Sequence, residues 1–356
     1  MPQLALHLLG SFQASLDGSA ITAFETHKVR ALLAYLAVEA DRPHARDELV
    51  GLLWPDQPDQ AARASLRQAL ANLRKAVGDR TAEPPFLCIT PDSIQFQRSN
   101  NCWIDSVAFT DLIAVCHSHT HRQLAACRSC ARRLQQAVEL YRGDFLAQFL
   151  QSGSEAFEEW LLLKRERLHQ AAFDALYALA EYHDRRGEYD RAQHYARRQL
   201  ELDPWREEAH RQVMRALALC GQRSAALAQY GTCRRVLAHE LDAAPSQETT
   251  LLFDKIQAGE LASGDRRHNL PTSPTPLIGR QRELTEIDQL LDNPSSRLLT
   301  LTGPGGIGKT RLAVQAAWEY VGLFQDGVWL IEFAPLSDVA LVPHTVASTL
   351  GLLETG

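Results

Sequence analysis

A glycine-rich segment near residue 305 has the residue types and spacing that bind nucleotide phosphates. Residues 303–310, GPGGIGKT, fit the pattern GxxxxGK[ST] in full. In such a loop, glycines let backbone N–H groups curl around phosphates at a helix N-terminus, while the lysine reaches the β- and γ-phosphates and the hydroxyl binds Mg²⁺. We therefore expect ATP or ADP with Mg²⁺ as cofactors. The loop residues predicted to hold them are Gly303, Gly305, Gly306, Gly308, Lys309 and, through Mg²⁺, Thr310.

A second cluster gathers cysteine and histidine within 15 residues. Cys116-x₂-His119 followed by Cys127-x₂-Cys130 has the pairwise spacing of a structural zinc site, with His121 as an alternative ligand. Reduced cytosolic thiols favour zinc over a disulfide. The alternative is a histidine-rich loop beside a helix that carries two incidental cysteines, and the sequence leaves both interpretations open.

A third group of residues could bind a polyanion. The segment 61–77 carries four basic residues and no acidic one. At 100° per residue, Arg63, Arg67 and Arg74 fall within about 40° of one another on a helix, and Lys75 lies nearby. Such a face attracts DNA phosphates, although basic amphipathic helices are also common as ordinary solvated surfaces.

The elements that would position this face are readable from residues 1–98. Apolar residues alternate over 4–16, which predicts half-buried strands, and Asp17-Gly18 predicts a tight turn after them. Helical spacing then indicates a helix from about residue 29, a short one around Leu49–Leu53, and a third over 61–77. Residues 87–96 are typical of a hairpin. Together these elements predict a winged helix-turn-helix, with the third helix in the major groove and the hairpin as the wing.

The sequence of this region resembles a known family. The turn LLWPD and the helix SLRQAL…LRKA, within residues 4–98, resemble the DNA-binding domain of SARP/AfsR-type regulators, which has the OmpR-type winged-helix fold. The resemblance implies contacts to promoter DNA from this helix, assisted by polar side chains. The predicted DNA-binding residues are Arg63, Ser65, Arg67, Gln68, Asn72, Arg74 and Lys75.

Residues 103–258 have an almost wholly helical pattern that contains an internal repeat. GEYDRA at 187–192 and GQRSAA at 221–226 lie 34 residues apart, the tetratricopeptide period, and Leu202-Asp203-Pro204 ends one helix pair. The strings AVELYRGDFLAQF and FEEWLLLKRERL resemble the bacterial transcriptional activator domain. That resemblance implies contacts with RNA polymerase and homo-oligomer formation, whereas a structural spacer is the alternative.

The surroundings of the glycine-rich loop indicate a P-loop domain over 277–356, after a linker at 259–276. Residues 297–301 predict a buried strand, 311–320 a helix, and 327–333 the next strand. LIGRQRE at 277–283 resembles the hhGRxxE element of STAND-class ATPases, including NB-ARC modules, and implies that Ile278, Gly279 and Arg280 lie close to the nucleotide. Because no acidic Walker B strand follows Phe333, hydrolysis by this chain is not supported. A vestigial domain is one explanation; we expect instead a fragment of a longer protein.

Composition indicates a globular protein, and the patterns, motifs and resemblances above together predict a multidomain, mainly α protein that ends in a partial P-loop α/β domain. The net charge is −6, so DNA contact must come from a local patch. No apolar run reaches the ~18 residues that span a bilayer, and no basic residue precedes Lys28, so we expect a cytoplasmic protein without membrane contact. We expect a transcriptional activator with a nucleotide-controlled switch. The alternative is a STAND-type signalling ATPase whose N-terminal domains bind protein rather than DNA, and a metabolic ATPase is disfavoured.

Overall fold

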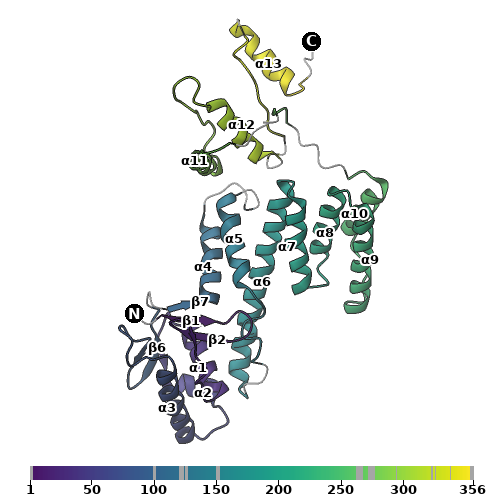
Figure 1. Cartoon of the computed structure of the whole chain (residues 1–356). Coiled ribbons are helices and arrows are strands. Elements are labelled where there is room, and N and C mark those ends of the chain that lie inside the picture. The colour runs from purple at the N-terminus through teal and green to yellow at the C-terminus, as the bar shows by residue number, and fades with distance from the viewer. Residues whose placement is uncertain are drawn as a thin grey trace. The chain divides into compact units, whose positions relative to one another are not determined.

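The computed structural model describes residues 3–98, 102–119, 124, 127–149, 153–261, 268–271, 277–293, 295–321, 324, 326–336 and 338–352 (Figure 1). The chain divides into two compact units. The first combines residues 1–118 with 133–175, and the second combines 119–132 with 176–356. Helix α5 (Arg128–Leu140) and helix α6 (Glu155–Arg185) each contribute to both units. The first unit therefore joins residues of the predicted winged helix to part of the predicted repeat domain.

A four-stranded sheet opens the first unit. Strand β1 (Leu4–His7) pairs antiparallel with β2 (Gln13–Leu16), which pairs with β3 (Ser19–Ala20), and β7 (Cys102–Ile104) lies parallel to β1 on its other side. Asp17 and Gly18 both have positive φ, as the predicted tight turn requires. The alternating pattern buries Leu4 and Leu6 completely, so the predicted strands are confirmed.

Three helices and a hairpin follow. They are α1 (His27–Val38), α2 (Arg46–Leu53) and α3 (Asp59–Ala76), and then β5 (Leu87–Ile89) and β6 (Ser93–Phe96), with β4 (His44–Ala45) paired to β6. Helix α3 buries Leu66, Ala69, Leu70 and Leu73 and packs against α1 and α2. This is the element order predicted for a winged helix-turn-helix.

A buried carboxylate ties the first strand to the helices that follow. Asp105 begins α4 (Asp105–Ser118) and has no exposed surface. Its two oxygens accept hydrogen bonds from the backbone amides of Leu8, at 2.7 Å, and Leu9, at 3.1 Å. Farther along the chain, Trp160 Nε1 and Lys164 Nζ of α6 contact the carboxylate of Glu39 at 2.9 and 2.8 Å. These contacts explain why residues beyond 98 belong to the same compact unit.

The second unit contains a run of packed helices. After the end of α6 come α7 (Tyr189–Leu202), α8 (Glu207–Leu219), α9 (Arg223–Glu240) and α10 (Gln247–Ala258). Helix α7 packs on α8, α8 on α9, and α10 on both α8 and α9 (Figure 1). Helix α7 ends at Leu202, as predicted from Asp203-Pro204. The tetratricopeptide assignment stays a prediction.

The glycine-rich region folds differently from its prediction. It contains α11 (Gln281–Asp292), α12 (Lys309–Tyr320), a short 3₁₀ turn (Val339–Leu341) and α13 (Val342–Thr349). The helix predicted over 311–320 is confirmed, but the strands predicted over 297–301 and 327–333 are wrong. Leu298 is 86% exposed, and in the described part of 327–333 only Val328 makes a bridge, to His268. A parallel strand is stable when neighbouring strands and helices cover it, and the described residues provide no such sheet here.

No described helix combines the length and the apolar character that crossing a membrane requires.

Candidate functional site

Helix α3 presents part of the predicted basic face to solvent. Arg67, Gln68 and Lys75 are exposed. Arg63 is exposed as well, and its guanidinium lies 3.0 Å from the Asp47 carboxylate of α2. Ser65 is half-buried, and its hydroxyl donates to Gln57 at 2.8 Å. The helix therefore offers basic and amide side chains that can approach a polyanion.

Two of the predicted contact residues are used inside the fold instead. Asn72 is buried, its amide nitrogen donates to Ala23 O and its oxygen accepts from Glu25 N, both at 3.2 Å. It therefore anchors the segment that leads into α1, and its role as a DNA contact stays a prediction.

Arg74 also has a structural task. Its Nε donates to Asp79 at 2.8 Å, and the other oxygen of this buried carboxylate accepts from Leu87 N at the start of the hairpin. Asp79 thus connects Arg74 of α3 to the first strand of the predicted wing, and the charge of Arg74 balances that of Asp79.

The glycine-rich loop contains three glycines in backbone conformations that other residues rarely adopt. Gly303, Gly306 and Gly308 all have positive φ. A Cβ on Gly303 would lie 2.6 Å from Ile307 Cδ1, so the Ile307 side chain would have to move to admit one. Gly308 is the N-cap of α12 with φ 89°, where glycine avoids strain. The loop therefore delivers Lys309 and Thr310 to the first turn of a helix, where the dipole favours anions.

The side chains around this loop leave its lysine available. Lys309 Nζ donates to the carbonyl oxygens of Gly303, at 2.9 Å, and Pro304, at 2.8 Å. Arg280 lies beside the loop, since its guanidinium donates to Ile307 O at 3.3 Å. Ile278 is largely exposed. Arg280, Ile307 and Lys309 line a cavity of about 260 Å³ together with α11.

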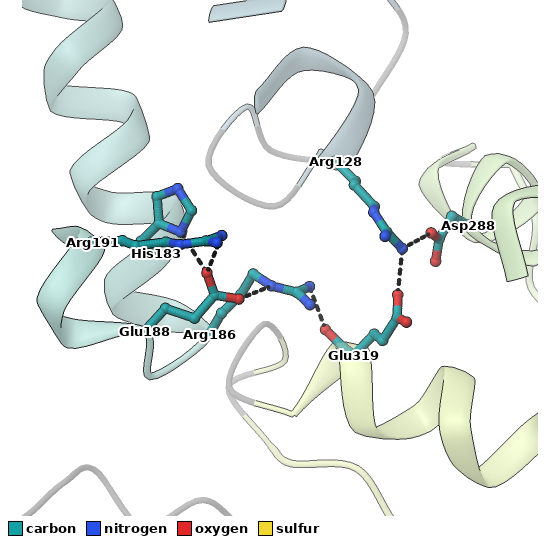
Figure 2. Close-up of polar contacts among 7 residues, drawn as sticks. All are labelled: Arg128, His183, Arg186, Glu188, Arg191, Asp288 and Glu319. Carbon is teal, nitrogen blue, oxygen red and sulfur yellow. Dashed lines mark hydrogen bonds and ion pairs between the residues drawn. The ribbon is translucent and has the colours of Figure 1, made fainter. Parts of the chain in front are cut away.

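An ionic cluster lies at the far end of α12 (Figure 2). One guanidinium nitrogen of Arg128 forms ion pairs with two carboxylates. It lies 2.6 Å from Glu319 and 2.8 Å from Asp288 of α11. Arg186, after α6, donates to the backbone oxygen of Glu319 at 2.9 Å. Arg186 also binds Glu188, which His183 contacts at 2.7 Å. The helix that begins at the glycine-rich loop therefore ends against two arginines of residues 103–258.

Burial and charge oppose each other in this cluster. Burial raises the pKa of Glu319 above its ordinary value, although the Arg128 charge acts in the opposite direction. Burial alone would lower the pKa of Arg128, but Glu319 and Asp288 outweigh it and raise the pKa. Glu188 behaves differently: burial would raise its pKa, but the hydrogen bonds from His183 and Arg186 lower it.

Sequence reasoning missed the ionic cluster. Arg128 lies 160 residues before Asp288 and 191 before Glu319, so no spacing pattern links them. The one available signal was the position of Arg128 between Cys127 and Cys130.

The predicted cysteine and histidine ligands are partly brought together. His119 Nδ1, Cys127 Sγ and Cys130 Sγ lie within 4.8 Å of one another. Cys116 is buried in the last turn of α4, and its role as a ligand stays a prediction. His121 lies outside the described residues.

Comparisons with known proteins identify relatives of this chain. Residues 104–257 match the family described as bacterial transcriptional activator domain. The chain is 26% identical to the regulatory protein AfsR of Streptomyces coelicolor, over 96% of this chain and 35% of AfsR. It is also 26% identical to the transcriptional regulatory protein EmbR of Mycobacterium tuberculosis, over 71% of this chain and 63% of EmbR. The chain thus spans about a third of the length of AfsR.

A solved structure shares the fold. It is Mycobacterium tuberculosis EmbR in complex with a low-affinity phosphopeptide, with a TM-score of 0.57 and 26% identity over 72% of this chain and 66% of EmbR. The predicted resemblance to this group of regulators is confirmed.

Proposed function

We propose that this chain, a SARP/AfsR-type regulator by homology, controls transcription in the cytoplasm by binding promoter DNA through α3 and the β5–β6 hairpin. The single observation that carries the proposal is the exposed basic face of α3 on a helix packed against α1 and α2 and followed by a hairpin. Exposed Arg67 and Lys75 contact phosphates or base edges. The surface pair Arg63–Asp47 contributes only about 0–1 kcal/mol, so a phosphate can compete with Asp47 for Arg63.

Footprinting and affinity measurements on the region upstream of the encoding gene test this proposal. Replacing Arg67 and Lys75 together with Ala is expected to weaken binding by about 10-fold or more and to lower the salt slope by about 2. The control Arg234→Ala/Lys255→Ala removes the same charge from exposed positions on α9 and α10. Wild-type protein without salt-sensitive DNA affinity would overturn the proposal and favour the STAND-type sensor that binds protein through its N-terminal domains.

We infer further that residues 303–310 bind ATP or ADP and that the bound nucleotide controls the DNA-binding function. Lys309 Nζ is held by neutral carbonyl oxygens rather than by a carboxylate, so phosphate oxygens offer it a stronger charge-assisted partner. The Thr310 hydroxyl would hold Mg²⁺, which supplies charge neutralisation at the phosphates. Helix α12 supports the coupling, because it connects Lys309 of the loop to Glu319 over about 15 Å.

Nucleotide binding and coupling are tested separately. Lys309→Ala is expected to abolish binding of a fluorescent ATP analogue, whereas Lys255→Ala leaves it unchanged. In wild type, ATP should change the affinity for DNA, and Arg128→Ala should remove that change while the analogue still binds. If wild type binds the analogue but ATP leaves DNA affinity unaltered, the nucleotide site stands and the switch is wrong. Contacts with RNA polymerase and homo-oligomer formation stay predictions from the family resemblance.

A further inference from the structure

The segment between α4 and α5 brings three metal-binding donor atoms together. His119 Nδ1 lies 3.2 Å from Cys130 Sγ and 3.5 Å from Cys127 Sγ. Both cysteines are buried, with 1% and 0% exposure, and neither forms a disulfide. His119 follows the end of α4, and Cys130 lies in the first turn of α5. Donors from the ends of two helices therefore converge on one buried point.

The spacing of these atoms suits a tetrahedral ion. Bonds of about 2.3 Å to sulfur and about 2.0 Å to nitrogen place the two donor types about 3.5 Å apart around Zn²⁺. The observed distances of 3.2 and 3.5 Å are close to this value. An ion could bind with only small side-chain movements, because the three donor atoms already lie close together.

The amide of Cys130 donates a hydrogen bond to Cys127 Sγ at 3.5 Å. Two thiolates and an imidazole are the donors that Zn²⁺ takes in structural sites, whereas Mg²⁺ and Ca²⁺ take oxygen. The chemistry of the donor set therefore points to a thiophilic cation.

We propose that His119, Cys127 and Cys130 bind a structural Zn²⁺ that holds His119 against the start of α5. The fourth position is taken by water or by a further side chain, for which Cys116 is the sequence-based candidate. The ion has a structural consequence outside its own loop. Arg128 lies between the two cysteines in the sequence and forms ion pairs with Asp288 of α11 and Glu319 of α12. The metal would therefore fix the position of the arginine that both helices contact.

Metal analysis of the full chain tests the site. Protein from zinc-supplemented cells is expected to retain about one zinc per chain after gel filtration in a mild chelator. Cys127→Ser/Cys130→Ser should lose this zinc, and Cys233→Ser, at an equally buried cysteine of α9, should keep it. Folded wild type without stoichiometric zinc would overturn the proposal, as would zinc retention by the double variant.

Cobalt substitution keeps the proposal testable if the double variant fails to fold. Co²⁺ added to metal-free wild type should give the visible bands of a tetrahedral site and a near-ultraviolet thiolate charge-transfer band. Absence of both bands in folded protein would overturn the proposal. Cys116→Ser should reduce the charge-transfer band by about a third if Cys116 is a third thiolate, and should leave it unchanged if water is the fourth ligand; both results support the three-donor site.

Discussion

The N-terminal strands and the segment that enters the glycine-rich loop have similarly apolar sequences, but the first are buried and the second is exposed. Leu4 and Leu6 of β1 are completely buried, because β2 and β7 flank the strand and helices cover it. Leu298, in an equally apolar run, is 86% exposed. The loop itself nevertheless has its positive-φ glycines and its helix. The conformation of the glycine-rich loop is therefore a local property of the backbone, whereas a strand needs partners.

The largest predicted effect comes from removing the buried carboxylate of the well-packed region. Asp105→Ala leaves the amides of Leu8 and Leu9 without acceptors in a site that water does not reach. We expect a loss of about 2–5 kcal/mol in the free energy of unfolding of the first unit, because each unsatisfied buried group costs about 1–3 kcal/mol. Hydrogen exchange of the peptide that covers β1 and β2 would measure it.

The matched control is Asp111→Ala, at an exposed position of the same helix. It is expected to change protection by no more than about 0.5 kcal/mol. Equal effects of the two substitutions would show that the Asp105 contacts do not hold β1 to α4.

Sequence patterns were sufficient where burial is local or repeats with a period. The alternation in β1, the helical stripe of α3 and the Asp17-Gly18 turn each encode their own structure. The patterns were insufficient where the partner is remote: Asn72 has a polar side chain on a helix, but its partners Ala23 and Glu25 lie almost 50 residues away. The same limit applies to Arg128 and its two carboxylates. Of the predicted zinc ligands, His119, Cys127 and Cys130 converge, because their separation along the chain is short.

A second, intermediate effect concerns the docking of α12, which depends on ion pairs rather than on a packed sheet. Arg128→Ala should raise hydrogen exchange in the C-terminal half of α12, since two partly buried carboxylates, Asp288 and Glu319, would then lose their common cation. Removing one partner of a buried pair typically costs about 3–5 kcal/mol, and the partial exposure of Arg128 makes a smaller value, about 1–3 kcal/mol, reasonable here. Arg132→Ala, an exposed arginine on the same helix, should have little effect.

Glu319→Gln should behave differently from Arg128→Ala and should be neutral or stabilising at pH 7. Burial raises the pKa of Glu319, so the docked state binds a proton more tightly than the undocked state. The favourable contribution of the protonated carboxyl is fully present below about pH 4.5 and is lost as the pH rises through the raised value. The difference in exchange between wild type and Glu319→Gln should therefore grow with pH in this window. A constant difference would show that Glu319 is not desolvated.

The smallest predicted effect is that of Leu298→Ala. An apolar side chain contributes to stability in proportion to the area that folding removes from water, and Leu298 retains most of its exposure. We expect a change of no more than about 0.5 kcal/mol, whereas the same substitution at Leu6 should cost about 2–5 kcal/mol because it opens a cavity in a covered sheet. Thermal or urea unfolding, read by hydrogen exchange in each region, compares the two variants directly. A loss of more than about 1 kcal/mol in the free energy of unfolding for Leu298→Ala would contradict this prediction. It would mean that other residues cover residues 297–302 in solution, and the contrast with β1 would then not hold.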